Sequence, residues 1–181
     1  MEPNNVADVR IYMPPETKRF LGDERMLQLR PRDVRHEEWC ALLGQEVYSA
    51  QGHIIGVALE QFSGTDFEIE DMLAHIADDT NWPTVAESSR NAISYKLDDY
   101  HRTGLFSSKG LSVRDLLEDG TCNILMLRDL RNEDKSLITA VIARNIFNIM
   151  GQHHNTKKIS SFFNKEIEDD GLPDRVWLVI D

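Results

Sequence analysis

The spacing of apolar residues changes twice along the chain and divides it into three regions. Residues 1–30 contain two short strand-like runs, "DVRIYM" and "MLQLR", which are separated by a proline pair and a Gly-Asp turn signal. Two short strands do not form a stable sheet by themselves. We therefore expect them to need further structure from later in the chain.

Residues 31–104 have helical spacing. One face of a predicted helix collects the apolar residues Leu43, Val47, Ala50, Ile54, Val57, Ala58 and Phe62. Gly52 and Gly56 interrupt this pattern, and each costs about 1 kcal/mol relative to alanine inside a helix. The pattern therefore predicts either a break or a tight helix contact at these two glycines.

Two more helices are predicted in the same region. The stretch Thr65–Glu68 resembles a capping box, and the helix that it opens runs to about residue 79 with many acidic residues and no lysine or arginine. Another helix is predicted from Ser88 or Ser89 to Thr103, and the glycine after it is the expected stop. We interpret the whole region as an acidic helical insertion.

Residues 105–181 alternate between helix and strand. A short helix, "VRDLLEDG", is followed by a strand, "CNILMLRDL", a long apolar helix, "NEDKSLITAVIARNIFNIM", and a final strand, "VWLVI". A strand, a helix and a strand in this order predict a βαβ unit with parallel strands. In such sheets ligands bind beyond the carboxyl ends of the strands, where Asp129 and Asp181 would lie.

Composition limits the classes of function. The 181 residues are 41% hydrophobic with a net charge of −11, which fits one globular domain and argues against non-specific coating of DNA. Cys40 and Cys122 lie far apart without a paired-cysteine motif, which favours buried thiols in a reducing compartment. No apolar run approaches the roughly 18 residues of a membrane span. We expect a cytoplasmic protein with no membrane partner.

The last residues, "RVWLVID", suggest nucleotide chemistry. P-loop domains use an apolar strand that ends in aspartate to hold Mg²⁺ beside bound phosphates. The same pattern also describes an ordinary strand whose final aspartate starts a turn. The phosphate-binding motif, Gly-x-x-x-x-Gly-Lys followed by Ser or Thr, is absent, because the chain contains no Gly-Lys pair.

A longer series of features resembles a known family. The order of "MLQLRPRDVRHEEWCALLGQEVYSAQGHIIGVALEQF", then "GTCNILMLRDL" with its long helix, then "GLPDRVWLVID", resembles the central ATPase domain of the HerA-like helicases. These belong to the HerA and FtsK group of hexameric P-loop translocases. The resemblance spans most of the chain and implies an α/β fold, namely a partial RecA-like P-loop ATPase domain with a mostly parallel sheet and an acidic helical insertion.

The resemblance also implies a function and a site. Asp181 matches the Walker B aspartate, which orients Mg²⁺ through water, so it is the candidate catalytic and metal-binding residue. The family's catalytic glutamate would come next, and the phosphate loop would lie before Met1. We therefore expect a fragment, inactive and without cofactor by itself, of an ATP-dependent DNA translocase. The parent would bind ATP and Mg²⁺, form a hexameric ring on double-stranded DNA, and in some relatives work with a nuclease.

Two other classes of protein remain open. One is a complete, non-catalytic interaction domain that uses its acidic helices as a docking surface. The other is a catalytically inactive paralogue that joins a ring. Either reading requires no nucleotide chemistry from this chain.

Three basic features carry weaker expectations. Acidic residues interleave with Arg25, Arg30, Arg32 and Arg35, which predicts an ion-paired surface rather than a phosphate site. The stretch "GQHHNTKK" predicts an exposed loop, with contact to DNA as the alternative, and its two histidines lack the neighbours of a zinc site. Arg144 lies within an apolar helix and is expected to reach solvent or a neighbouring subunit's phosphate.

Overall fold

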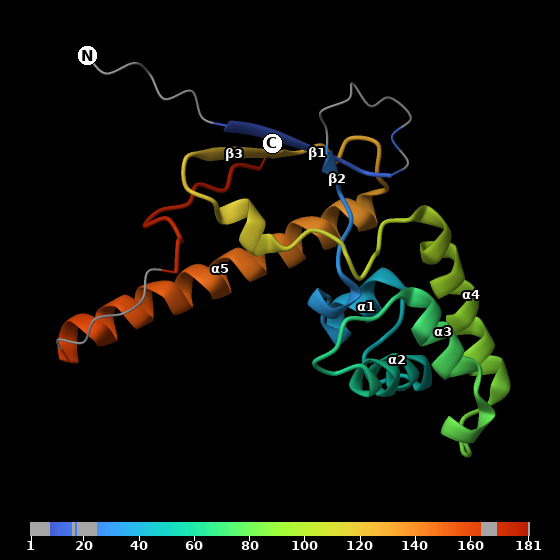
Figure 1. Ribbon diagram of the computed structural model, residues 1–181. Coiled ribbons are helices and arrows are strands. Elements are labelled where there is room, and N and C mark those ends of the chain that lie inside the picture. The colour runs from blue at the N-terminus through green and yellow to red at the C-terminus, as the bar shows by residue number, and fades with distance from the viewer. Residues whose placement is uncertain (1–7, 16, 18–24, 164–169, 181) are drawn as a thin grey trace, which may run out of the picture.

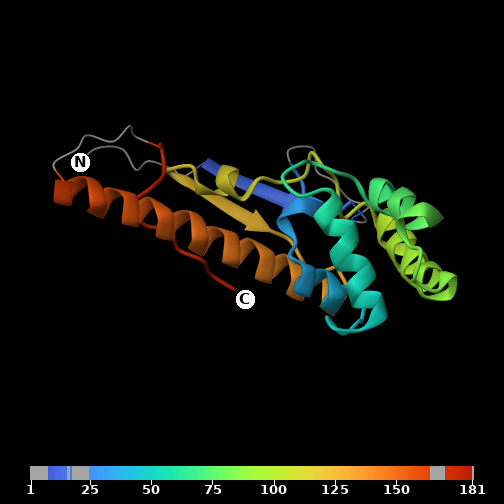
Figure 2. The ribbon, with the colours of Figure 1, turned by 90° about the horizontal axis from the view of Figure 1, so that it is seen from below.

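The computed structural model describes residues 8–15, 17, 25–163 and 170–180, and within them the chain has an α/β fold with a small parallel sheet. Figure 1 shows the sheet on one side of the long helix α5 (Asn132–Phe163), while the other α-helices gather beyond one end of it. Seen from below, α5 runs along the sheet and extends past it (Figure 2).

The sheet joins the first region of the chain to the third. Strand β1 (Asp8–Met13) lies in the middle, with β2 (Arg25–Met26) and β3 (Thr121–Leu125) parallel to it on either side. The register of β1 and β3 pairs Val9 with Cys122 and Ile11 with Ile124. The structure thus confirms strands in "DVRIYM" and "CNILMLRDL" and the parallel sheet. The run "MLQLR" contributes little strand, because β2 is only two residues long.

Helices α1 to α4 form a unit that we call the helical block. Its elements are α1 (His36–Leu42), α2 (Ala50–Gln61), α3 (Ile69–Ala77) and α4 (Glu87–Thr103), with two 3₁₀ turns, η1 (Pro31–Asp33) and η2 (Asp79–Asn81). Fully buried side chains join the four helices: Trp39, Ile54, Ile55, Met72, Ile76, Ile93 and Leu97. Helix α4 ends as predicted, since Gly104 adopts a left-handed conformation with φ of 67°.

The predicted single helix over residues 43–62 is wrong, because the chain breaks earlier than the glycines suggested. Gly44 has a φ of 60°, and the side chain of Ser49 caps α2 by accepting a hydrogen bond from the Gly52 amide at 3.0 Å. A Cβ at Gly52 would lie 2.3 Å from the carbonyl oxygen of Glu46. Gly52 therefore serves a tight contact inside α2, which was the other expectation for this position.

The start of α3 also differs from the prediction by one turn. The Thr65 hydroxyl donates to the carbonyl of Phe62 at 2.9 Å and closes the preceding turn. The backbone N–H of Glu68 instead donates to the Asp71 carboxylate at 2.8 Å, so the side chain that caps the helix lies three residues later than expected. The acidic helix is correct in type but shorter at both ends.

Helix α5 is much longer than predicted. The stretch "GQHHNTKK" belongs to this helix and is not a loop. One glycine costs a helix only about 1 kcal/mol, and nothing lies within 4 Å of where a Cβ at Gly151 would be, so the helix continues through it. The helix is also not buried all round, because the side chain of Phe147 is 73% exposed.

The predicted final strand, "VWLVI", is wrong for the described residues, since 176–180 contain no strand. An apolar, β-branched sequence becomes a strand only where a neighbour supplies ladder hydrogen bonds. The described strands pair only with one another. The parallel pair in this structure is β1 with β3 instead of the two strands of the predicted βαβ unit.

Candidate functional site

The predicted catalytic and metal-binding residue, Asp181, lies outside the described residues. The segment that leads to it, residues 170–180, runs in the same direction as β3 (Figure 1), and on the side of β3 away from β1 (Figure 2). Its apolar side chains at Trp177, Val179 and Ile180 are mostly exposed to solvent. The segment therefore has the direction expected of a neighbouring parallel strand without the hydrogen bonding of one.

Asp129 lies where the sequence placed it. It occupies a turn shortly after β3 and is exposed. Because β1 and β3 are parallel, their carboxyl ends share one edge of the sheet, and Asp129 lies just beyond that edge. It is a candidate oxygen ligand, the kind that Mg²⁺ prefers.

One face of the sheet has no cover among the described residues. We call it the uncovered sheet face, and its side chains are Val9, Ile11, Met26, Cys122, Ile124 and Met126. They are apolar or weakly polar. The exposed fractions of the five apolar side chains range from 37% at Ile11 to 54% at Val9. The opposite face packs toward α5 and the 3₁₀ helix η3 (Val113–Leu117), as Figure 1 shows.

The two cysteines fall on opposite sides of this division. Cys40 is buried in α1, and burial raises the pKa of its thiol, followed by a smaller effect of Glu37. Cys122 is exposed on β3. Both thiols are free, so the prediction of buried thiols is confirmed for Cys40 and wrong for Cys122.

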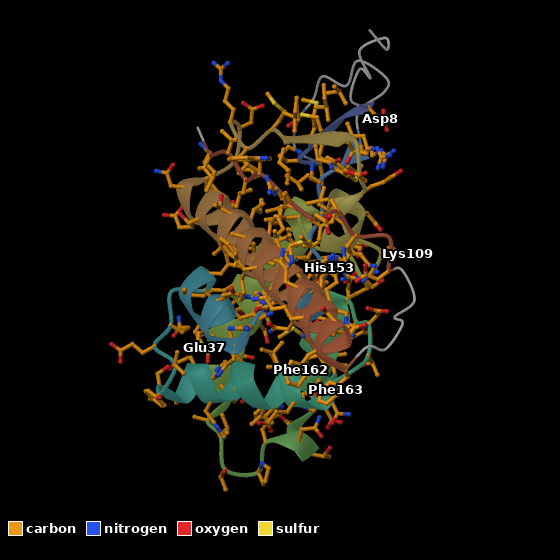
Figure 3. The ribbon with its side chains drawn as sticks, turned by 90° about the vertical axis from the view of Figure 1, so that its left-hand side faces the viewer. Asp8, Glu37, Lys109, His153, Phe162 and Phe163 are labelled. Atoms are coloured by element: carbon orange, nitrogen blue, oxygen red, sulfur yellow. The ribbon has the colours of Figure 1, made fainter. Side chains whose placement is uncertain are left out.

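A buried histidine links α5 to the C-terminal segment. His153 is 4% exposed, and its Nδ1 lies 2.8 Å from a carboxylate oxygen of Asp170. The hydrogen bond from His153 is the main reason that the pKa of Asp170 is lowered. Figure 3 labels His153 along α5, with Phe162 and Phe163 nearer the end of that helix. Sequence reasoning placed His153 in an exposed loop, because the helix was expected to end at Met150.

Further contacts hold the same segment. Arg114 donates to the Asp170 carbonyl oxygen at 2.7 Å, and the Lys157 ammonium lies 2.6 Å from the Asp174 carboxylate. Leu172 and Val176 are partly buried and pack against the main core. The segment is therefore attached along residues 170–176 and exposed beyond them.

A shallow open pocket of about 440 Å³ lies between β1, β2 and the loop before η3. Arg10, Arg25 and Lys109 line it together with Asp115 and Glu118. The Arg10 guanidinium lies 2.9 Å from Asp8 and 2.5 Å from Glu118, and these two carboxylates raise its pKa. A pocket of mixed charge whose central arginine is already paired does not select one kind of charged ligand.

The other basic features are structural. Arg30 pairs with Asp33 at 2.7 Å, and Arg32 pairs with Asp66 at 3.0 Å, which confirms the ion-paired surface for these two arginines. Arg144 is only partly exposed and pairs within the chain. It donates to both carboxylate oxygens of Glu38, at 3.0 and 2.8 Å, and so joins α5 to α1.

Comparisons with known proteins add no further identification. No protein-family model, curated protein or solved structure matched the chain. Across the described ranges, no helix combines the length and apolar character needed to cross a bilayer.

Proposed function

We propose that this chain is part of the ATPase domain of a HerA-type DNA translocase, in which ATP hydrolysis at the interfaces of a hexameric ring moves double-stranded DNA. The observation that carries the proposal is the all-parallel sheet with one uncovered apolar face. Parallel sheets occur almost only where both faces are covered. An uncovered apolar face on a parallel sheet is therefore expected where a further layer of the same α/β domain packs on it.

The path of the C-terminal segment supports the same proposal. Residues 170–180 run parallel to β3 on its free side and carry the apolar run that precedes Asp181. A carboxylate that follows such a run lies at the carboxyl edge of the sheet, the edge that Asp129 also occupies. Both carboxylates would then face a nucleotide bound at this edge.

The carboxylates proposed at this edge suit Mg²⁺ bound beside phosphates better than they suit a metal ion held by protein ligands alone. The described residues contain no group of three histidine, cysteine, aspartate or glutamate side chains placed to share a metal ion. Mg²⁺ beside phosphates needs only one or two protein carboxylates and keeps several waters. Bound there, magnesium would neutralise charge on the transferred phosphoryl group. Asp181 would hold the ion through water, and Asp129 would extend the acidic edge.

The alternative, an acidic docking surface, receives less support from the helical block. Some of its carboxylates have basic partners in the same block. Arg90 pairs with Asp79 beyond the end of α3, and His101 lies 3.3 Å from Glu70 on α3. Internal partners neutralise the charge that a basic ligand would need. We therefore retain the interaction domain only as the outcome to expect if the ATPase proposal fails.

The DNA sequence on both sides of this reading frame tests the proposal. We expect an in-frame Gly-x-x-x-x-Gly-Lys-Ser/Thr motif upstream and a glutamate directly after Asp181. In the protein made from that longer frame, Asp181→Asn should abolish ATP turnover, with Asp119→Asn as an exposed control. A start codon at Met1 with a stop codon directly after Asp181 would overturn the proposal and leave the interaction domain.

A further inference from the structure

His153 has an unusual pair of environments for its two ring nitrogens. Nδ1 faces the Asp170 carboxylate at 2.8 Å, whereas Nε2 is buried and has no hydrogen-bond partner among the described residues. An ionised carboxylate can only accept hydrogen bonds, so Nδ1 carries a hydrogen, and the polar Nε2 is buried without a partner among the described residues. Leaving that nitrogen buried costs free energy, which the contact with Asp170 must offset.

An aspartate that orients a histidine is also the arrangement of a general base. A base must bring its free nitrogen within hydrogen-bonding distance of a substrate proton, directly or through one water. Nε2 of His153 has almost no solvent-accessible surface, and the ring as a whole is buried against α5 and its neighbours. The geometry therefore favours a positioning role over proton transfer.

The carboxylate of Asp170 is the centre of a small network. Its two oxygens accept separate hydrogen bonds, one from His153 and one from the backbone N–H of Leu172 at 3.2 Å. Its carbonyl oxygen accepts from Arg114 of η3. One residue of the C-terminal segment is thus held by α5, by η3 and by its own backbone turn.

We propose that His153 is the anchor that fixes the path of residues 170–176 along α5. The proposal stands on the contacts of the described residues alone. Lys157 and Asp174 form a second, more exposed contact one helical turn further along α5, which tolerates loss more easily.

Hydrogen exchange measured by mass spectrometry tests the anchor on the 181-residue chain. In His153→Ala, the Leu172 amide, which donates to the Asp170 carboxylate, should exchange about tenfold faster, because Asp170 loses the hydrogen bond that holds it to α5. Asn155→Ala is the matched control, since Asn155 lies on the same helix two residues further on and is exposed. It should leave the exchange of the Leu172 amide unchanged.

A conservative variant separates positioning from general packing. His153→Asn keeps a side-chain N–H near the position of Nδ1 and should restore most of the protection, although it fills less volume. If His153→Ala does not fold, Asp170→Ala removes the same contact from the more exposed side and should release the same amide. Equal exchange in wild type, His153→Ala and Asp170→Ala would overturn the anchor, and so would a failure of His153→Asn to restore protection.

These outcomes are independent of nucleotide. The anchor is tested without ATP, so a positive result would survive a failure of the ATPase proposal. Conversely, an in-frame P-loop upstream with unchanged exchange in His153→Ala would support the ATPase and reject the anchor.

Discussion

The helical block and the sheet differ in how far their apolar side chains are exposed to solvent. In the block, α1 to α4 bury large side chains completely, with Trp39 at 0% exposure stacked on Phe106 at a ring distance of 4.8 Å. At the sheet and the C-terminal segment, comparable side chains remain in solvent, with Trp177 at 88% exposure. The block has a closed core, whereas the sheet presents a surface on which more structure would pack.

This contrast indicates where function is to be sought. A helical block whose core is closed and some of whose carboxylates are paired offers few apolar groups to a ligand. The sheet edge offers the exposed carboxylate of Asp129 and an uncovered face. The ion pair between Arg144 and Glu38 joins the two regions, so a ligand at the sheet edge would act on a firmly attached scaffold.

The largest effect should come from truncating a tryptophan in each region. Trp39→Ala empties a fully buried site in the block and should lower the free energy of unfolding by about 3–5 kcal/mol. Trp177→Ala removes an exposed ring and should change it by less than about 0.5 kcal/mol. Urea unfolding of both variants measures the difference. Similar losses would mean that the two regions are equally packed.

A pair of glycines offers the next largest contrast. Gly52→Ala in α2 places a Cβ 2.3 Å from the Glu46 carbonyl oxygen and should destabilise the protein by about 1–3 kcal/mol. Gly151→Ala in α5 meets no atom within 4 Å and should stabilise it by about 1 kcal/mol through helix propensity. Thermal unfolding should therefore shift in opposite directions. A shift of the same sign in both variants would contradict the close approach at Gly52.

The ion pair that joins the regions should have a smaller effect. Glu38→Gln removes the charge that receives both hydrogen bonds from Arg144, which should cost about 1 kcal/mol in urea unfolding. Asp98→Asn removes the exposed partner of Arg102 on α4 and should cost less than about 0.5 kcal/mol. If Glu38→Gln costs no more than this control, the two regions are not joined through Arg144.

The smallest expected effect is the loss of one carboxylate's contribution to stability at low pH. The pKa of Asp170 lies below its ordinary value of 3.8, chiefly because His153 donates to it, so its contribution to stability is complete above pH 3.8 and is lost as the pH falls through the lowered pKa. The Leu172 amide, which donates to Asp170, reports this change in an NMR titration from pH 5 to about pH 2. We expect its midpoint below 3.8 in wild type and no transition of this origin in Asp170→Asn. A midpoint above 3.8 would contradict the contact.

The sequence predicted the elements whose signals are local. Strand β1, helix α4 and the acidic helix α3 all followed from periodicity and punctuation, and Gly104 marked the end of α4. The parallel sheet was also correct, although the pairing of β1 with β3 was not foreseen. Pairing between segments more than a hundred residues apart has no signal in local spacing.

The errors lie at the ends and breaks of helices. The predicted helix stopped at Met150, whereas α5 continues to Phe163, and the break at Gly44 was missed because the apolar spacing continues across it. The helix end at Met150 also hid the contact between His153 and Asp170. No sequence signal distinguishes a buried histidine from an exposed one in a polar stretch, since the contact depends on how a distant segment folds back.

The most direct test of the contrast uses the one cysteine in each region. Timed reaction with a thiol reagent under native conditions reports the accessibility of both. We predict that Cys122 on the uncovered sheet face reacts at once, and that Cys40 in the helical block reacts only when the protein unfolds. Protection of Cys122 in the native protein would contradict an uncovered sheet face, and rapid reaction of Cys40 would contradict a closed helical block.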